Sequence, residues 1–302
     1  MAERAGPGIV ERLEPGLRRI LAPNPSAMTE RGTNTYILGE GRVAVIDPGP
    51  EDAAHLRALL DAVSGERVSH ILVTHAHRDH SALAAPLARA TGAPVFAFGD
   101  AGAGRSEAMR RLAARGLSGG GEGVDAGFVP DEIVADGAAI EGDGWRLEAL
   151  WTPGHFGNHL CFGWGDRWFT GDLAMGWSSS LISPPDGDVT QFMASCERLA
   201  ARLSPGRAQV LHAGHGAPVR DPSGRLAWLL DHRRGREAQI LAALGEGPAT
   251  LPALARRVYA DLAPALLPTA ERNVLAHLVD LHGRDLVTAR PDLDAGATFA
   301  AR

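Results

Sequence analysis

Residues 68–80 read Val-Ser-His-Ile-Leu-Val-Thr-His-Ala-His-Arg-Asp-His. The apolar first half of this stretch predicts a buried β-strand, and a loop dense in donor atoms follows it at once. The loop donors are His75, His77, Asp79 and His80, with no cysteine nearby. Nitrogen and oxygen donors without sulfur suit a divalent ion that keeps an open, water-binding position. We expect His75 and His77 to face one ion and Asp79 and His80 to face a second.

The overall composition is that of an ordinary soluble globular protein. Its 302 residues are 45% hydrophobic, which is enough for one large domain with a sizeable core and a smaller second domain. The 30 basic residues are all arginine; they face 36 acidic residues and leave a formal charge of -6. This balance offers no positive surface for nucleic acid.

The cysteine count and the N-terminus favour the cytoplasm. Cys161 and Cys196 are the only cysteines, so neither a disulfide framework nor a cysteine-rich zinc site can form. Residues 1–16 carry charges and lack the apolar core of a secretory signal, and no later window has the length of a membrane span. We therefore expect a cytoplasmic protein without a membrane partner.

Short β-rich runs alternate with helical stretches up to about residue 219, which predicts a layered α/β fold. The expected strands are Thr35–Leu38, Val43–Ile46, Ile71–Val73, Val95–Ala97, Leu147–Trp151, Leu160–Phe162, Trp168–Thr170 and Val210–Leu211. The expected helices are Asp52–Val63, Leu83–Ala90 and Phe192–Leu203. A Gly- and Ala-rich stretch, Gly99–Gly127, interrupts this alternation and predicts an insertion with one helix at Ser106–Arg115.

The remainder of the chain is helical and ends in a hairpin. The expected elements are helices at Arg225–Leu244, Leu251–Tyr259 and Ala270–His282, N-caps at Thr250 and Thr269, and strands at Leu286–Ala289 and Ala297–Ala300. Three helices followed by a ribbon give the order of a winged helix. We divide the chain into a catalytic domain, residues 1–222, and a winged-helix-like domain, residues 223–302. Acidic and basic residues nearly balance in the second domain, so packing or homodimer formation is favoured there over contact with nucleic acid.

Three later motifs each place a histidine or aspartate beside glycine at the end of a strand. His155 closes Thr-Pro-Gly-His, Asp172 closes Thr-Gly-Asp, and His212 and His215 share the run His-Ala-Gly-His-Gly. Glycine lets the backbone approach a site closely. These motifs would complete the roughly seven ligands that two ions require.

The ordered series of motifs resembles the metallo-β-lactamase superfamily over residues 34–216. The resemblance implies an αββα sandwich with metals at one edge, where loops from both halves converge. It assigns His75, His77 and His155 to the first metal, Asp79, His80 and His215 to the second, and Asp172 to a bridge between them. His215 is preferred to His212 because glycines flank it as in the family, which leaves His212 to the core.

Two further residues are expected near the site. Asp47 resembles the family's aspartate that orients the metal-binding loop by hydrogen bonding. His159 could reach the site or the substrate, and a role as a hydrogen-bonded histidine without a metal is equally open. Tyr36, Phe156 and Trp177, together with loop 178–186 and insertion 99–127, are expected to line a substrate pocket.

The implied chemistry is hydrolysis. Two divalent ions can share one water, lower its pKa and polarise the carbonyl or phosphoryl group that it attacks. The hydroxide that bridges them would attack an ester, thioester or phosphodiester, and Asp79 would act as a catalytic residue that stabilises the oxyanion or the leaving group. Zinc is the expected metal, with iron or manganese as alternatives.

The C-terminal half narrows the resemblance to β-lactamase-like hydrolases with a winged helix, a group that includes a single-strand endoribonuclease; glyoxalase II is more distant. The substrate is therefore a small molecule or a short single-stranded nucleic acid. Two alternatives stay open, a single-strand endoribonuclease and a mononuclear iron persulfide dioxygenase. The second would leave Asp79 and His80 without metal.

Overall fold

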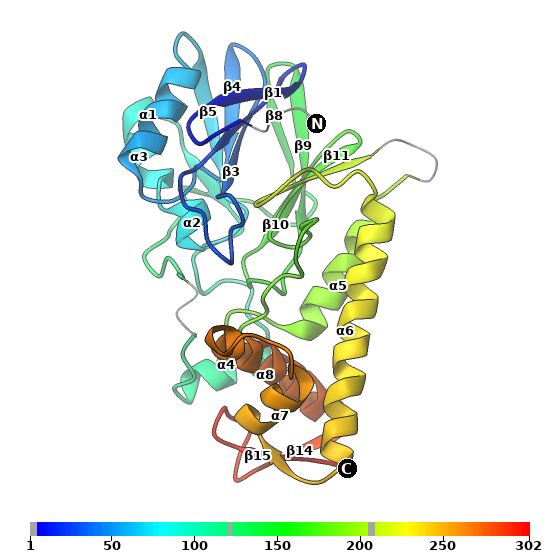
Figure 1. Ribbon diagram of the computed structural model, residues 1–302. Helices are drawn as coiled ribbons and strands as arrows, with labels where there is room; N and C mark the ends of the chain where they lie inside the picture. The colour runs from blue at the N-terminus through cyan, green and yellow to red at the C-terminus, as the bar shows by residue number, and fades with distance from the viewer. Residues whose placement is uncertain (1–4, 120–122, 205–208) are drawn as a thin grey trace.

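The computed structural model describes residues 5–119, 123–204 and 209–302. Two mixed β-sheets, whose strands all end by residue 213, lie face to face (Figure 1). The seven strands of the first sheet follow chain order: β1 (Val10–Glu14), β2 (Leu17–Leu21), β3 (Asn34–Leu38), β4 (Arg42–Ile46), β5 (Arg67–Leu72), β6 (Val95–Ala97) and β7 (Glu132–Ile133). Neighbours from β1 to β4 are antiparallel, and those from β4 to β7 are parallel.

The second sheet has five strands in the order β12-β11-β10-β9-β8. They are β8 (Ala139–Gly142), β9 (Trp145–Trp151), β10 (Leu160–Trp164), β11 (Arg167–Gly171) and β12 (Val210–Ala213). All neighbours are antiparallel except β11 and β12, which run parallel.

Period-two alternation along the strands builds a separate core on each face of the first sheet. Tyr36 and Leu38 of β3 point into the core between the two sheets, whereas Ile37 lies in the core under the outer helices. β4 behaves in the same way, with Ala44 and Ile46 inside the sandwich. The first sheet is therefore apolar on both faces and must be covered on both.

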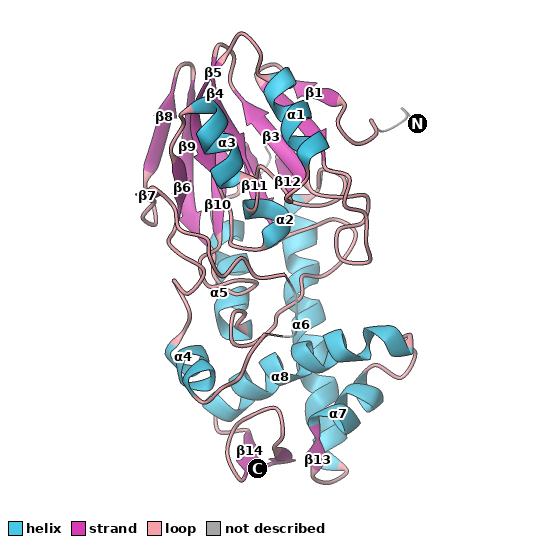
Figure 2. Cartoon of the chain, turned by 90° about the vertical axis from the view of Figure 1, so that its left-hand side faces the viewer, coloured by secondary structure: helices cyan, strands magenta, loops and turns pink. Residues whose placement is uncertain are grey.

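Helices cover both outer faces and complete four layers; the two helices on the first sheet lie in front of it in Figure 2. The first sheet carries α1 (Ala53–Ala62) and α3 (Ala84–Thr91), and the second carries α5 (Val189–Ala200) and the first half of α6 (Pro222–Gly245). Each helix buries one apolar stripe, for example Leu59 on α1 and Phe192 on α5. The predicted αββα sandwich is confirmed.

The C-terminal body contains the predicted helices and ribbon, at the lower end of the molecule in Figure 1. After α6 come β13 (Ala249–Thr250), α7 (Leu251–Val258), a 3-10 turn at Pro264–Leu266, α8 (Leu267–Gly283), β14 (Val287–Arg290) and β15 (Thr298–Ala301). Antiparallel pairing joins them in the order β13-β15-β14. The insertion also contributes, because Met109 and Leu112 of α4 (Glu107–Ala114) lie in the same core.

The two bodies share helix α6. Leu226 and Leu229 belong to the core beneath the second sheet, whereas Ile240 and Leu244 belong to the C-terminal core. The boundary predicted between residues 222 and 223 falls at the start of this shared helix and stays a prediction. Within the described residues, no helix, α6 included, has both the length and the apolar character that crossing a bilayer requires.

Helix starts in the C-terminal body differ in detail from those predicted. Thr250 occupies the N-cap position of α7, but its side chain makes no capping hydrogen bond. The prediction that Thr269 caps the third helix is wrong, because α8 already begins at Leu267. Pro268 explains the earlier start, since its fixed φ and missing N–H suit the first turn of a helix.

Candidate metal centre

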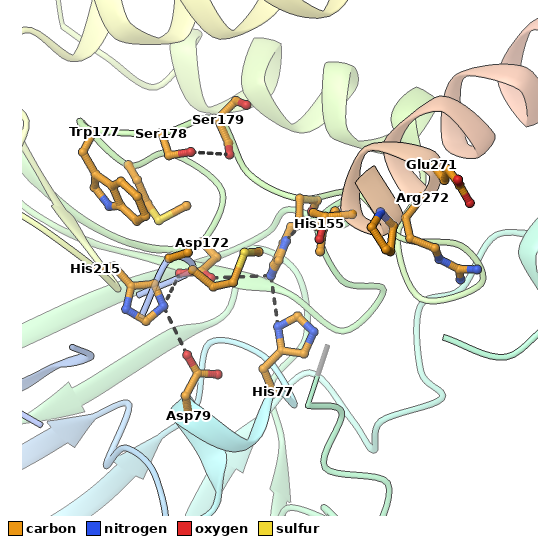
Figure 3. A pocket seen from close by; sticks show the side chains of 16 residues that line it. His77, Asp79, His155, Asp172, Trp177, Ser178, Ser179, His215, Glu271 and Arg272 are labelled. Atoms are coloured by element: carbon orange, nitrogen blue, oxygen red, sulfur yellow. Dashed lines mark hydrogen bonds and ion pairs between the residues drawn. The ribbon is translucent and has the colours of Figure 1, made fainter. Parts of the chain in front are cut away.

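Each proposed ligand lies just beyond the end of a strand, at one edge of the sandwich. His75, His77, Asp79 and His80 follow β5, and the last two belong to the short helix α2 (Arg78–Ser81). His155 follows β9, Asp172 follows β11 and His215 follows β12. The structure thus brings together donors from four strand ends, which Figure 3 shows pointing toward one another. Strands of both sheets that end at one edge hold such side chains on rigid supports.

The first donor group joins His75, His77, His155 and Asp172, all buried, with ligand atoms within 4.8 Å of one another. His77 Nδ1 lies 2.9 Å from His75 Nε2 and 3.1 Å from His155 Nε2. A single proton on Nδ1 can serve only one of these two neighbours. One cation among the three nitrogens would satisfy all of their lone pairs, so the group fits a metal ion.

The second donor group joins Asp79, His80 and His215, also with ligand atoms within 4.8 Å of one another. His215 Nε2 lies 3.2 Å from Asp79 Oδ2 and 3.3 Å from His80 Nε2. Two imidazole nitrogens and a carboxylate oxygen again form a donor set that zinc or another borderline cation accepts.

Asp172 stands between the two groups. Its Oδ2 lies 3.6 Å from His155 Nε2, and its Oδ1 lies 3.5 Å from both His80 Nε2 and His215 Nε2. Oδ1 is buried and has no hydrogen-bond partner among the described residues. An orphaned carboxylate oxygen facing two imidazoles is what a bridging ligand leaves when no ion is present.

Burial and charge give the two groups different protonation. Burial and the nearby His155 lower the pKa of His77 to about 3, and burial likewise lowers the pKa of His75 and His155. These imidazoles are neutral at pH 7, as ligands must be. Burial also disfavours the charged form of His80, but the carboxylates of Asp79, Asp172 and Asp47 outweigh it and raise its pKa to about 9, so an ion in the second group would have to displace a proton from this ring.

Asp47 holds the ligand loop as expected from the resemblance. Its Oδ1 accepts the Thr74 backbone N–H at 2.7 Å, and its Oδ2 accepts the Thr74 hydroxyl at 2.8 Å and lies 2.9 Å from His80 Nδ1. Asp47 adopts φ 51°, a left-handed conformation that aspartate tolerates better than most residues. The result is a fixed His80 ring whose Nε2 faces Asp172.

His159 lies behind Asp172 and outside both donor groups. Its Nδ1 is 2.8 Å from the Thr152 hydroxyl, and its Nε2 accepts the Asp172 backbone N–H at 3.3 Å. Both ring nitrogens are therefore engaged, so of the two roles left open, the structure supports the hydrogen-bonded histidine without a metal.

Two backbone carbonyls that sequence reasoning missed complete the surroundings. His155 Nδ1 donates to the Leu181 carbonyl oxygen at 2.6 Å, and His215 Nδ1 donates to the Gly32 carbonyl oxygen at 3.2 Å. These bonds turn the Nε2 atom of each ring toward the donor groups. Any residue supplies a carbonyl, so no sequence signal could have identified them.

The placement of His212 and Gly214 follows from close packing. His212 is buried between Tyr36 and Phe169, away from both donor groups, and the preference for His215 agrees with this geometry. A Cβ on Gly214 would lie 2.5 Å from His80 Cε1 and 2.7 Å from Asp172 Oδ1. Only glycine therefore lets the backbone pass this close to the second group.

A pocket of about 350 Å³ opens onto both donor groups (Figure 3). Its lining residues are Ala27, Met28, His77, Asp79, His155, Asp172, Met175, Trp177, Ser178, Ser179, Leu181, His215, Pro268, Thr269, Glu271 and Arg272. Trp177 and part of loop 178–186 lie where they were predicted.

The prediction that Tyr36 and Phe156 line the pocket is wrong. Tyr36 is 2% exposed and its hydroxyl donates to the Ala213 carbonyl oxygen at 2.7 Å, so it holds the end of β12. Phe156 is 1% exposed and packs behind the His77 ring. Both aromatic rings are used for packing beneath the donors, which removes them from the pocket wall.

Insertion 99–127 borders the site less directly than predicted. None of its described residues lines the main pocket, although Val124 borders a small cavity beside His77 and His155. Residues 120–122 of the insertion lie outside the described part of the chain. One wall of the pocket instead comes from the first two turns of α8, where Figure 3 labels Glu271 and Arg272. These two residues carry no motif and lie far beyond Asp172 in the chain, so nothing in the sequence linked them to the site.

An αββα sandwich that gathers imidazoles and carboxylates at one edge defines a class of enzymes that are generally metal-dependent and hydrolytic. The chain belongs to the metallo-beta-lactamase superfamily, whose model matches residues 28–245; a model of the beta-lactamase associated winged helix domain matches residues 250–295. The predicted family and the predicted winged helix are both confirmed.

Individual proteins show the same likeness. The chain is 32% identical to the beta-lactamase-like protein 2 homolog of Drosophila melanogaster, over 90% of this chain and 89% of that protein. It is 29% identical to the atrochrysone carboxyl ACP thioesterase of Claviceps purpurea, over 78% and 67% of the two chains. The solved structure of a metallo-beta-lactamase family protein from Thermus thermophilus matches with a TM-score of 0.75 and 27% identity, over 96% and 100% of the two chains.

Proposed function

We propose that this chain is a dinuclear metal-dependent hydrolase that cleaves the thioester or ester bond of a substrate with an apolar acyl group. The observation that carries the proposal is the pair of donor groups that share Asp172 beneath one pocket. Zinc is the proposed ion because every donor is nitrogen or oxygen. The two free, buried cysteines, Cys161 and Cys196, fit a reducing cytoplasm.

The pocket wall supports an apolar acyl group. Its apolar lining residues include Met28, Met175, Trp177, Leu181 and Pro268. Its volume of about 350 Å³ is at the small end of the range for small-molecule sites. A relative named as an ACP thioesterase supports an acyl thioester as the bond that is cleaved.

Bound divalent ions would activate a water and polarise the acyl carbonyl. Among the chain's own groups, Asp79 lines the pocket, and its side chain is 26% exposed. A negative carboxylate repels a developing oxyanion, so its role differs from the stabilising role first expected. We assign Asp79 the role of accepting a hydrogen bond from the attacking water and passing the water's proton to the leaving thiolate or alkoxide as the carbon–sulfur or carbon–oxygen bond breaks.

The test is a substrate panel on protein reconstituted with zinc: acyl thioesters, esters, a lactam, single-stranded RNA and a persulfide. We expect thioester or ester cleavage that a chelator abolishes. The specificity constant kcat/KM should rise about 4-fold for each methylene added to a short acyl chain until the pocket is filled. Burying one methylene stabilises the bound state by about 0.8 kcal/mol.

Other outcomes would redirect the assignment. RNA cleavage without thioester cleavage would favour the endoribonuclease. Oxygen consumption with persulfide by protein reconstituted with iron, at one iron per chain, would favour the dioxygenase. Asp79→Asn tests the assigned role: with enough zinc added to fill both sites it should still lose most of the hydrolysis, because asparagine keeps a ligand oxygen but cannot accept the proton of the water.

A further inference from the structure

Arg233 of α6 is a buried cation that no carboxylate of the described residues pairs with. It is 2% exposed, and burial lowers its pKa to about 10, which leaves it charged at neutral pH. Its contacts are the Ser180 carbonyl oxygen, Asn273 Oδ1 at 3.1 Å and the face of Phe192 at 5.2 Å. Burying a guanidinium in this way costs several kcal/mol before its contacts offset the penalty, and an apolar side chain would pack more cheaply. Stability alone therefore does not account for Arg233.

Asn273 of α8 connects Arg233 to the loop that follows β11. Its Oδ1 accepts from Arg233 Nη1 and also from the Ile182 backbone N–H, each at 3.1 Å. Arg233 and Asn273 thus hold consecutive peptide groups: the carbonyl of the 180–181 peptide and the N–H of the 181–182 peptide.

The held peptides contact two proposed metal ligands. The carbonyl of the 181–182 peptide is the Leu181 oxygen that accepts from His155 Nδ1 at 2.6 Å. One residue earlier, the Ser180 hydroxyl donates to the Asp172 backbone carbonyl. A chain of hydrogen bonds therefore runs from the two C-terminal helices to one ligand ring and to the backbone of the shared carboxylate.

We propose that Arg233 and Asn273 are positioning residues through which the shared helix α6 and helix α8 of the winged-helix body set the orientation of His155 and Asp172. The proposal rests on the metal centre of the proposed function. It gives the C-terminal body a role in the site in addition to forming one wall of the pocket. Because the relay acts on ligands, its loss should change metal binding even when no substrate is present.

The experiment uses full-length, metal-free protein titrated with Co²⁺, monitored by d–d absorption. Asn273→Leu has a similar volume but no acceptor, and we expect it to weaken cobalt binding about 10- to 100-fold and to alter the spectrum. Asn273→Asp keeps the acceptor oxygen and should restore affinity to within about 3-fold of wild type. The matched control is Arg234→Met, because Arg234 is adjacent but exposed and pairs with Asp231 and Glu197.

A second variant separates positioning from folding. Arg233→Met removes a buried charge, so the thermal midpoint of the metal-free protein should be unchanged or raised while cobalt affinity falls about 10-fold or more. Wild-type cobalt affinity and spectrum in both Asn273→Leu and Arg233→Met would overturn the positioning role. A wild-type chain that binds no cobalt would instead overturn the proposed function.

Discussion

The two sides of the pocket are built in different ways. The side that holds the donors comes from loops after β5, β9, β11 and β12, all supported by the sandwich. The opposite side comes from the first two turns of α8, in a body with its own core. Rigid strand ends suit chemistry that requires fixed geometry, whereas a wall from a second body can change substrate fit without moving a ligand.

The position of α8 also bears on what the winged helix can do. In its middle, α8 buries Val274, Leu275 and Leu278, and Asn273 bonds the loop after β11. Its first turn lines the pocket. The protein encloses α8 over most of its length, and the position of this helix links the C-terminal body to the donor groups.

The largest effect should come from the donor side, at the residue that joins the two groups. Asp172→Ala removes both carboxylate oxygens, and we expect the affinity of both metal sites and the rate of hydrolysis to fall by more than about 100-fold. Elemental analysis and thioesterase assays would measure this. His212→Ala, in the nearby core, should leave hydrolysis almost intact; full activity in Asp172→Ala would end the two-ion interpretation.

A smaller effect should distinguish the two donor groups from each other. Asp47→Asn preserves the left-handed backbone but replaces an oxygen facing His80 or Thr74 with an amide donor. We expect the second group to lose about 10- to 100-fold in metal affinity while the first retains its ion, so metal content falls from two toward one per chain.

The control for this change is Asp52→Asn. Asp52 caps α1 by accepting from the His55 N–H at 2.7 Å, and asparagine caps helices equally well. Its metal content should stay unchanged. Equal loss from both metal sites in Asp47→Asn would contradict the division into two groups.

The smallest effect on chemistry should come from the α8 wall. Thr269→Trp narrows the pocket without touching a ligand, so kcat/KM for a long acyl thioester should fall about 10-fold and that for an acetyl thioester less than about 2-fold. Thr298→Trp, on the exposed side of β15, provides a control of the same chemistry. A uniform loss of rate for all chain lengths would show that the wall affects catalysis and not selection.

Much of the donor side could be predicted from sequence. The run from His75 to His80 follows an apolar strand, and the glycine-flanked His155, Asp172 and His215 mark other strand ends. Short-range patterns of this kind depend on local backbone geometry, which the neighbouring residues largely determine. The four layers were expected from the resemblance to the metallo-β-lactamase superfamily, and the almost continuously buried strands β3 and β4 agree with it, because a sheet that is apolar on both faces requires cover on both.

Long-range contacts were beyond the sequence. Tyr36 and Phe156 have aromatic side chains of the kind that often line pockets, but here they are buried in packing contacts. Nothing about Arg233 or Asn273 indicates that they meet the loop that holds His155. The sequence by itself determined which atoms can bind metal and which strand ends carry them. Only the tertiary structure decided which residues from the C-terminal body position the donor atoms and which form the opposite wall of the pocket. These contacts depend on how the core of the sandwich and the core of the C-terminal body pack against each other.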